Sequence, residues 1–137
     1  LIKYGADVNA IQITKVTNDK YVYYDTSSVL EMVLRAGELD AIKLLEKNGA
    51  RFDVYPKNGL KSLITQACFN YSILEYLIFE KHVSIPDYCA FRQDHNSMPP
   101  RKIGLIELLN ENGVNSLSPK DKKIYDKISD YLKSKNP

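Results

Sequence analysis

The apolar positions of the chain recur at helical spacing in two neighbouring runs, residues 28–37 and 39–49, and each run ends in a glycine. Ser28 followed by Glu31 has the spacing of a capping box, which predicts that a helix begins there. A terminal glycine supplies the left-handed residue that commonly ends a helix. The two runs therefore predict a pair of short antiparallel helices.

The same pattern returns after a shift of 33 residues. Leu30 then falls on Leu63, and Gly37 falls on Asn70, which tolerates the left-handed conformation expected for Gly37. We therefore expect Asn70 to end the first helix of a second pair.

His82 falls on Gly49 in this alignment, so a side chain stands where the first pair has glycine. Positive φ costs a non-glycine residue about 1 kcal/mol. We expect the second helix of this pair to have a distorted end.

Three segments carry a common ending, namely Gly-Ala-Asp-Val-Asn-Ala at 5–10 and the related stretches 43–50 and 108–115. This ending and the period resemble the ankyrin repeat, although the family's opening motif keeps only its leucine at 28–31 and 61–64. The resemblance implies an all-α ankyrin-repeat solenoid of antiparallel helix pairs with connecting β-hairpins, one of them elongated, and a C-terminal capping helix.

On this interpretation one domain spans the chain, and we expect it to be the C-terminal part of a longer protein because it begins at Leu1 inside a helix. The exposed N-terminal edge then offers a surface for self-association. The expected divisions are a partial repeat at 1–10, a hairpin insertion at 11–27, repeats at 28–55 and 56–87, an irregular repeat at 88–115 and a capping helix at 116–137.

The insertion alternates apolar and polar residues, with Ile11 and Ile13 on one side of a turn-rich segment at 17–20. Tyrosines are concentrated beyond that turn. Two interpretations stay open, cross-strand packing of the aromatic rings or an adhesive arm that contacts a partner.

The third pair departs from the pattern. Pro86 predicts a helix that starts there and runs to about residue 95, until Met98–Pro100 breaks it. Its second helix is expected at about 102–112. Ser118 is an N-cap for a final helix at about 119–134.

The composition is that of an average globular protein, with 44% hydrophobic and 26% charged residues in a chain of 137. A net charge of +2 gives no electrostatic reason to expect nucleic acid or a membrane surface as partner. Two cysteines are too few for a disulfide framework, so we expect reduced thiols and an intracellular location, either cytoplasm or the cytoplasm of a host cell.

Catalytic and metal-binding patterns are weak. Cys89 and His95 are six residues apart but have no second ligand pair, so we expect no metal, no cofactor and no enzyme activity. Cys68 is expected to be a small apolar core residue.

Proteins that resemble this chain bind partners on the concave surface formed by hairpin tips and first helices. For Leu60 and Phe69 two interpretations stay open, partner anchors or packing against a neighbouring unit. The residues carried over by repeat position, together with the hairpin tyrosines, are Tyr21, Tyr23, Tyr24, Asp25, Ser27, Arg35, Lys57, Asn58, Leu60 and Phe69.

An aromatic, weakly charged surface of this kind suits a protein or peptide. The sequence therefore predicts a non-catalytic scaffold or adaptor module. The alternative is the targeting segment of a larger enzyme or pathogen effector whose catalytic part precedes Leu1.

Overall fold

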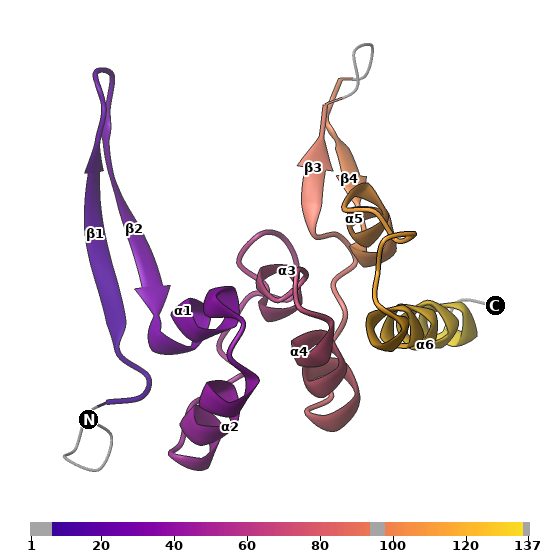
Figure 1. Cartoon of the computed structure of the whole chain (residues 1–137). Coiled ribbons are helices and arrows are strands. Elements are labelled where there is room, and N and C mark those ends of the chain that lie inside the picture. Colours follow the sequence, from indigo (N-terminus) through magenta and orange to yellow (C-terminus); the bar gives the residue numbers. More distant parts are fainter. Residues whose placement is uncertain (1–6, 94–97, 136–137) are drawn as a thin grey trace. The chain divides into compact units, whose positions relative to one another are not determined.

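The computed structural model describes residues 7–93 and 98–135, with the side chains of 23–25 outside the description. It forms two compact units, Leu1–Phe52 and Asp53–Pro137, which we describe separately (Figure 1). The boundary falls inside the repeat predicted for residues 28–55. The partial repeat expected at 1–10 lies mostly outside the described residues.

The first unit opens with a long β-hairpin. Strands β1 (Ile11–Thr17) and β2 (Val22–Ser28) pair antiparallel, with Ile11 opposite Ser28 and Thr17 opposite Val22. The elongated hairpin expected at 11–27 is therefore present and extends to Ser28. The alternation of apolar and polar residues was the correct signal.

Two helices follow the hairpin, α1 (Val29–Ala36) and α2 (Leu39–Lys47). The capping box is confirmed, because the Glu31 amide donates to Ser28 Oγ at 3.0 Å and the Ser28 amide donates to Glu31 Oε1 at 3.3 Å. Gly37 ends α1 with φ 77°, as expected. The helices contact one another, and their buried apolar residues are Leu30, Leu34, Ile42 and Leu45.

Asn9, which precedes the hairpin, forms hydrogen bonds with the loop that follows α2. Its Nδ2 donates to the Gly49 carbonyl at 3.1 Å, and its Oδ1 accepts from the Arg51 amide at 3.0 Å. One amide side chain thus satisfies two backbone groups in a loop.

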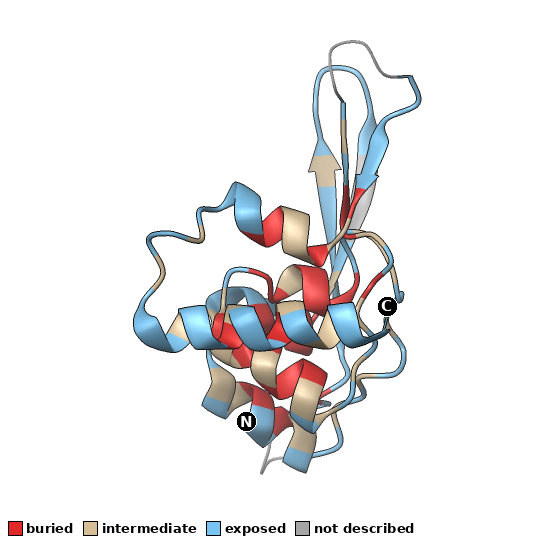
Figure 2. Ribbon diagram, turned by 90° about the vertical axis from the view of Figure 1, so that its right-hand side faces the viewer, coloured by how far each residue is buried: buried red, intermediate tan, exposed pale blue. Residues whose placement is uncertain are grey.

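The second unit contains short helices and a small hairpin. Its core includes the fully buried Ile64, Leu77, Ile103 and Ile128. Figure 2 shows the buried residues, in red, concentrated in the helical segments. The elements are α3 (Leu63–Gln66), α4 (Tyr71–Glu75), η2 (Tyr76–Glu80), β3 (Ala90–Arg92), β4 (Arg101–Ile103), α5 (Leu105–Glu111) and α6 (Pro119–Lys135).

The left-handed conformation predicted for Asn70 is wrong. Asn70 has φ −128° and ψ 104°, an extended backbone, and its Oδ1 accepts from the Ile73 amide at 3.1 Å. Asn70 therefore begins α4 as its N-cap instead of ending α3. The helix before it is reduced to four residues.

The distorted helix end expected at His82 is confirmed. His82 has φ 54°. The turn before it, η2, is a π-helix in which the Lys81 amide donates to the Tyr76 carbonyl at 3.0 Å. The wider turn and the left-handed residue end the helix together.

The helix predicted from Pro86 is wrong, because β3 pairs antiparallel with β4 in this region. The Cys89 amide extends the ladder by donating to the Ile103 carbonyl at 2.7 Å. The physical reason is the pairing itself: Ala90 lies opposite the fully buried Ile103, so the segment packs against the core as a strand. Pro99 and Pro100 suit the segment between strands better than a helix.

The final helix is present where expected. Helix α6 spans Pro119–Lys135, and the Asp121 amide donates to Ser118 Oγ at 3.2 Å, which confirms the N-cap. The helix contacts α4 and buries Ile124 and Ile128. Helix α5 begins at Leu105, three residues later than the predicted 102, because residues 101–103 belong to β4.

The predicted all-α ankyrin-repeat solenoid is wrong. Within residues 7–93 and 98–135 the helices are accompanied by two separate antiparallel two-stranded sheets, so the fold mixes α and β elements. The first helices of the two pairs are also unequal, since α1 has eight residues and α3 has four, and in the second pair α4 is continued by the π-helix η2. The family resemblance therefore stays a prediction from the sequence motif.

Candidate functional site

The β1–β2 hairpin is the longest exposed element of the first unit. Six of the seven β1 residues are exposed, on both faces of the strand. Ile11, Ile13, Tyr21 and Val22 have 63, 67, 59 and 54% of their surface exposed, which is unusual for large apolar side chains in one short segment. The hairpin therefore offers an apolar contact surface.

Asn18 organises the tip of this hairpin. Its Oδ1 accepts from the amides of Lys20 at 2.8 Å and Tyr21 at 2.9 Å, and its own amide donates to the Tyr21 carbonyl at 3.0 Å. An asparagine whose side-chain oxygen accepts hydrogen bonds from the backbone amides two and three residues later in the chain is typical of a tight turn. The tip thus holds Tyr21 in one backbone position at the end of the arm.

The predicted site residues of the first unit divide into three groups. Tyr21 is exposed at the hairpin tip. Tyr23, Tyr24 and Asp25 lie in β2, but their side chains are outside the described part of the structure. Ser27 and Arg35 contact each other at the hairpin base, where Arg35 Nη2 donates to Ser27 Oγ at 2.8 Å.

The second unit holds the other predicted residues. Leu60 and Phe69 are 71 and 78% exposed, so neither is packed in the core. Lys57 is exposed as well. Asn58 is structural, since its Oδ1 accepts from the Asp87 amide at 2.7 Å. The surface that these residues would form with the hairpin tyrosines stays a prediction.

An aromatic group near Asn58 was missed by the sequence analysis. The Gly59 amide donates to the Tyr88 carbonyl at 2.9 Å, and the Tyr88 ring lies 5.2 Å from the Phe91 ring. Lys102, the register partner of Phe91, places its Nζ 4.7 Å from the Tyr88 ring. The four consecutive apolar and aromatic residues 88–91 do not distinguish a strand from a helix by period, and Pro86 favoured the helix.

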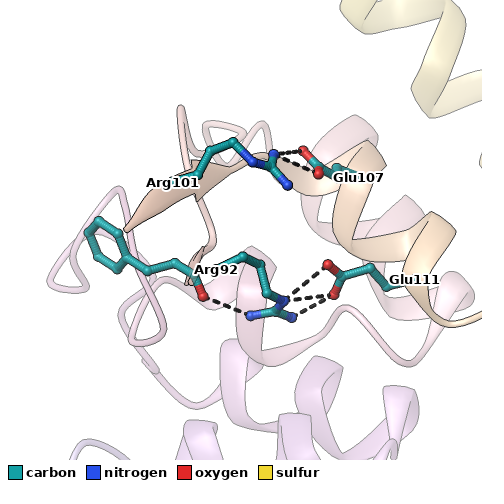
Figure 3. A network of polar contacts seen from close by, with 5 residues as sticks. Arg92, Arg101, Glu107 and Glu111 are labelled. Atoms are coloured by element: carbon teal, nitrogen blue, oxygen red, sulfur yellow. Dashed lines mark hydrogen bonds and ion pairs between the residues drawn. The ribbon is translucent and has the colours of Figure 1, made fainter. Parts of the chain in front are cut away.

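The opposite face of the β3–β4 pair is charged. Arg92 Nη2 lies 2.6 Å from Glu111 Oε1, and Arg101 Nη1 lies 2.7 Å from Glu107 Oε1 (Figure 3). Both glutamates are on α5, one turn apart. The hydrogen bond with Glu111 raises the pKa of the Arg92 guanidinium. These pairs fasten the hairpin to α5.

An open hollow of about 690 Å³ lies beside α5 and the end of α6. Glu107 is already bound to Arg101, and Lys135 lies 4.7 Å from the Tyr131 ring. Of the three charged residues that line the hollow, Glu107 and Lys135 therefore already interact with other side chains, and Asp87 is the third. The lining residues are Ser84, Ile85, Pro86, Asp87, Gly104, Leu105, Ile106, Glu107, Leu132 and Lys135.

The two cysteines are buried free thiols. Burial raises the pKa of Cys68 to about 11, with a smaller contribution from the nearby Cys89. Burial also raises the pKa of Cys89, and a hydrogen bond with Thr65 opposes that shift. Since the thiolate is the nucleophile, both groups have the environment of inert core residues. This agrees with the packing role expected for Cys68.

Metal ligands do not gather in the described residues, where no three His, Cys, Asp or Glu side chains come together. The Cys89–His95 pair is not tested by this, because His95 lies outside those residues. The described helices include none that is both long and apolar enough to cross a bilayer.

Comparison with known proteins gave no match: no family model, curated protein or solved structure is similar to this chain. The candidate site therefore depends on the geometry of the chain itself.

Proposed function

We propose that this chain is a non-catalytic protein-binding module and that the β1–β2 hairpin is its main contact surface. The observation that carries the proposal is the exposure of Ile11, Ile13 and Tyr21, each more than half exposed, on a single arm. Exposed apolar residues grouped in this way are typical of interaction sites, and tyrosine is enriched in the energetically important part of interfaces.

Three further features support a protein or peptide as the partner. The hairpin carries apolar and hydroxyl side chains with little charge, which favours a protein surface over a phosphate backbone. Leu60 and Phe69 give the second unit exposed apolar side chains as well. The described thiols are buried with raised pKa values, so they favour a structural role over a catalytic one.

We further propose that the module acts inside a cell. The support is the state of the two cysteines, because two buried thiols that form no disulfide suit a reducing compartment. Self-association through the N-terminal edge involves residues 1–6, which lie outside the described part of the chain.

Affinity capture with matched variants tests the binding function. The tagged protein, the triple variant Ile11→Ser/Ile13→Ser/Tyr21→Ser and the control Gln12→Ala/Thr14→Ala are each incubated with cell lysate, and bound proteins are quantified by mass spectrometry. The control changes the other face of the same strand. Circular dichroism of α1–α6 verifies that all three proteins are folded.

We expect the wild type and the control to capture the same proteins, and the triple variant to retain about a tenth or less of them. Loss of central interface residues costs 2 kcal/mol or more, which corresponds to a factor of about 30 in affinity. Equal capture by the triple variant and the wild type would refute the hairpin as the contact surface.

A further inference from the structure

One face of β1 carries a row of three exposed side chains with unlike chemistry. Ile11 and Ile13 are 63 and 67% exposed, and Lys15 follows them on the same face because side chains alternate along a strand. Lys15 is exposed, and within the described residues it has neither an ion pair nor a hydrogen bond through its ammonium group. The row therefore offers two apolar contacts and one unpaired cation.

The hairpin's own partner strand does not match this row. Ile11 lies opposite Ser28, and Ile13 lies opposite Thr26. Neither partner is a hydrocarbon side chain, and an aliphatic side chain opposite each isoleucine would cover more of its apolar surface. Ser28 is moreover committed to capping α1. Neither isoleucine thus has a hydrocarbon side chain directly opposite it on β2.

The backbone of β1 also has an open side. Among the strands of the described residues, β1 pairs with β2 alone, so its other edge presents a row of backbone donors and acceptors (Figure 1). A two-stranded hairpin is only marginally stable by itself, and a third strand would pair these groups. An extended segment is the shape that fits such an edge.

A second copy of β1 is a poor occupant of that edge. Antiparallel pairing about Thr14 would place each Lys15 opposite the Ile13 of the other copy, which gives the cation no counter-charge. Parallel pairing in register would place Lys15 opposite Lys15, and like charges in that position repel. Charge therefore favours a different strand, one with an acidic residue.

We propose that the free edge of β1 binds an extended peptide segment as an antiparallel third strand, with an acidic residue opposite Lys15 and aliphatic residues opposite Ile13 and Ile11. The inference rests on the proposed binding function and specifies its mode. Read from its N-terminus, the bound segment has an acidic residue and then aliphatic residues two and four positions later. Antiparallel pairing is the more stable arrangement per residue.

The probe is a seven-residue peptide with glutamate at its third position, valine at its fifth and seventh, and threonine elsewhere. It is titrated into the isotope-labelled protein, and binding is followed by the backbone amide shifts of residues 11–17. We expect the largest shifts in β1, and about three- to tenfold weaker binding when the peptide glutamate is replaced by lysine.

A charge exchange is the matched control. Lys15→Glu should reverse the preference, so that the lysine peptide binds this variant more tightly than the glutamate peptide does. Lys20→Glu, in the hairpin turn outside the strand, should leave the preference of the wild type unchanged. The same preference in Lys15→Glu as in the wild type would overturn the assignment of the acidic position.

Methylation of peptide amides tests strand addition directly. Only alternate amides of an added edge strand donate to its neighbour, so methyl groups on one alternate set should abolish binding and those on the other set should leave it within about twofold. Equal effects of the two sets would overturn the proposed strand.

Two other results would also overturn it. Concentration-dependent association of the protein, lost in Ile13→Ser, would assign the edge to a second copy. Failure of the glutamate peptide to bind, while Ile11→Ser/Ile13→Ser still abolishes capture from lysate, would leave the binding function standing and exclude strand addition as its mode.

Discussion

Arg92 and Arg101 lie directly opposite one another in the β3–β4 pair, and each binds a glutamate on the same face of α5. Like charges in opposing strand positions are destabilising unless neutralised. Glu111 and Glu107, one turn apart, supply that neutralisation. The hairpin and the helix are therefore coupled by two ion pairs that depend on each other.

Glu111→Gln should loosen the β3–β4 pair, because Arg92 then faces Arg101 without its full counter-charge. We expect hydrogen exchange at the amides of Ala90–Arg92 to become a few-fold faster. In the background Arg101→Gln the same substitution should have a smaller effect, since the opposing charge is gone. Equal effects in both backgrounds would show that the two ion pairs are independent.

His82→Gly should stabilise the protein. His82 has φ 54°, where a side chain is strained by about 1 kcal/mol, and the residue is exposed. We expect the free energy of unfolding to rise by about 0.5 kcal/mol, since glycine's extra entropy in the unfolded chain offsets part of the gain. Lys81→Gly, at φ −96°, is the control and should be destabilising. A loss of stability in His82→Gly would argue against strain at this position.

The stability of the protein should depend on the ionisation of Cys68. Burial raises the pKa of this thiol from 9.0 to about 11 in the folded chain. The neutral thiol therefore contributes its full stability below pH 9, and the contribution is lost as the pH rises towards 11. Urea unfolding at pH 8 and pH 10.5 should show a larger loss for the wild type than for Cys68→Ala. All other groups are common to both proteins, so identical losses would refute the effect.

Phe69→Ser and Leu60→Ser should leave stability within about 0.5 kcal/mol of the wild type, because both side chains are largely exposed. Leu77→Ala, at a fully buried position, should cost about 2–5 kcal/mol. Denaturant titrations measure all three. A cost above about 1 kcal/mol for Phe69→Ser would favour packing over an anchor role for this side chain.

Local sequence signals predicted several elements of this fold well. The Ser28–Glu31 capping box, the helix behind Ser118 and the hairpin from Ile11 are each encoded within a few neighbouring residues. The left-handed helix end at His82 could be predicted because Gly49 stands at the equivalent position of the first helix pair. These features depend on backbone geometry over one or two turns.

The errors came from extending a repeat across the chain. Asn70 suits both a left-handed end and an N-cap, and the hydrogen bond to Ile73 decided for the cap. The segment after Pro86 became a strand because Ala90 is buried and Ile103 pairs beside it, which is a tertiary effect. A similar period in the sequence therefore did not produce equal helix pairs.

The candidate site was predicted only in part. The hairpin and the exposure of Tyr21 at its tip agree with the sequence prediction, whereas the exposed row Ile11, Ile13 and Lys15 needed the strand register. Tyr88 and Phe91 were missed because their segment was assigned to a helix. The exposure of an apolar side chain depends on its surroundings in the fold and cannot be predicted from residue type alone.

The claim that the hairpin is the binding arm can be tested by site-specific photo-crosslinking. A photoreactive phenylalanine is introduced at Ile13 on β1, or at Lys123 on the exposed side of α6 as a control, and each protein is illuminated in cell lysate. We predict covalent adducts with a defined set of proteins from position 13 and none above background from position 123. Adducts from position 123 together with none from position 13 would contradict the account.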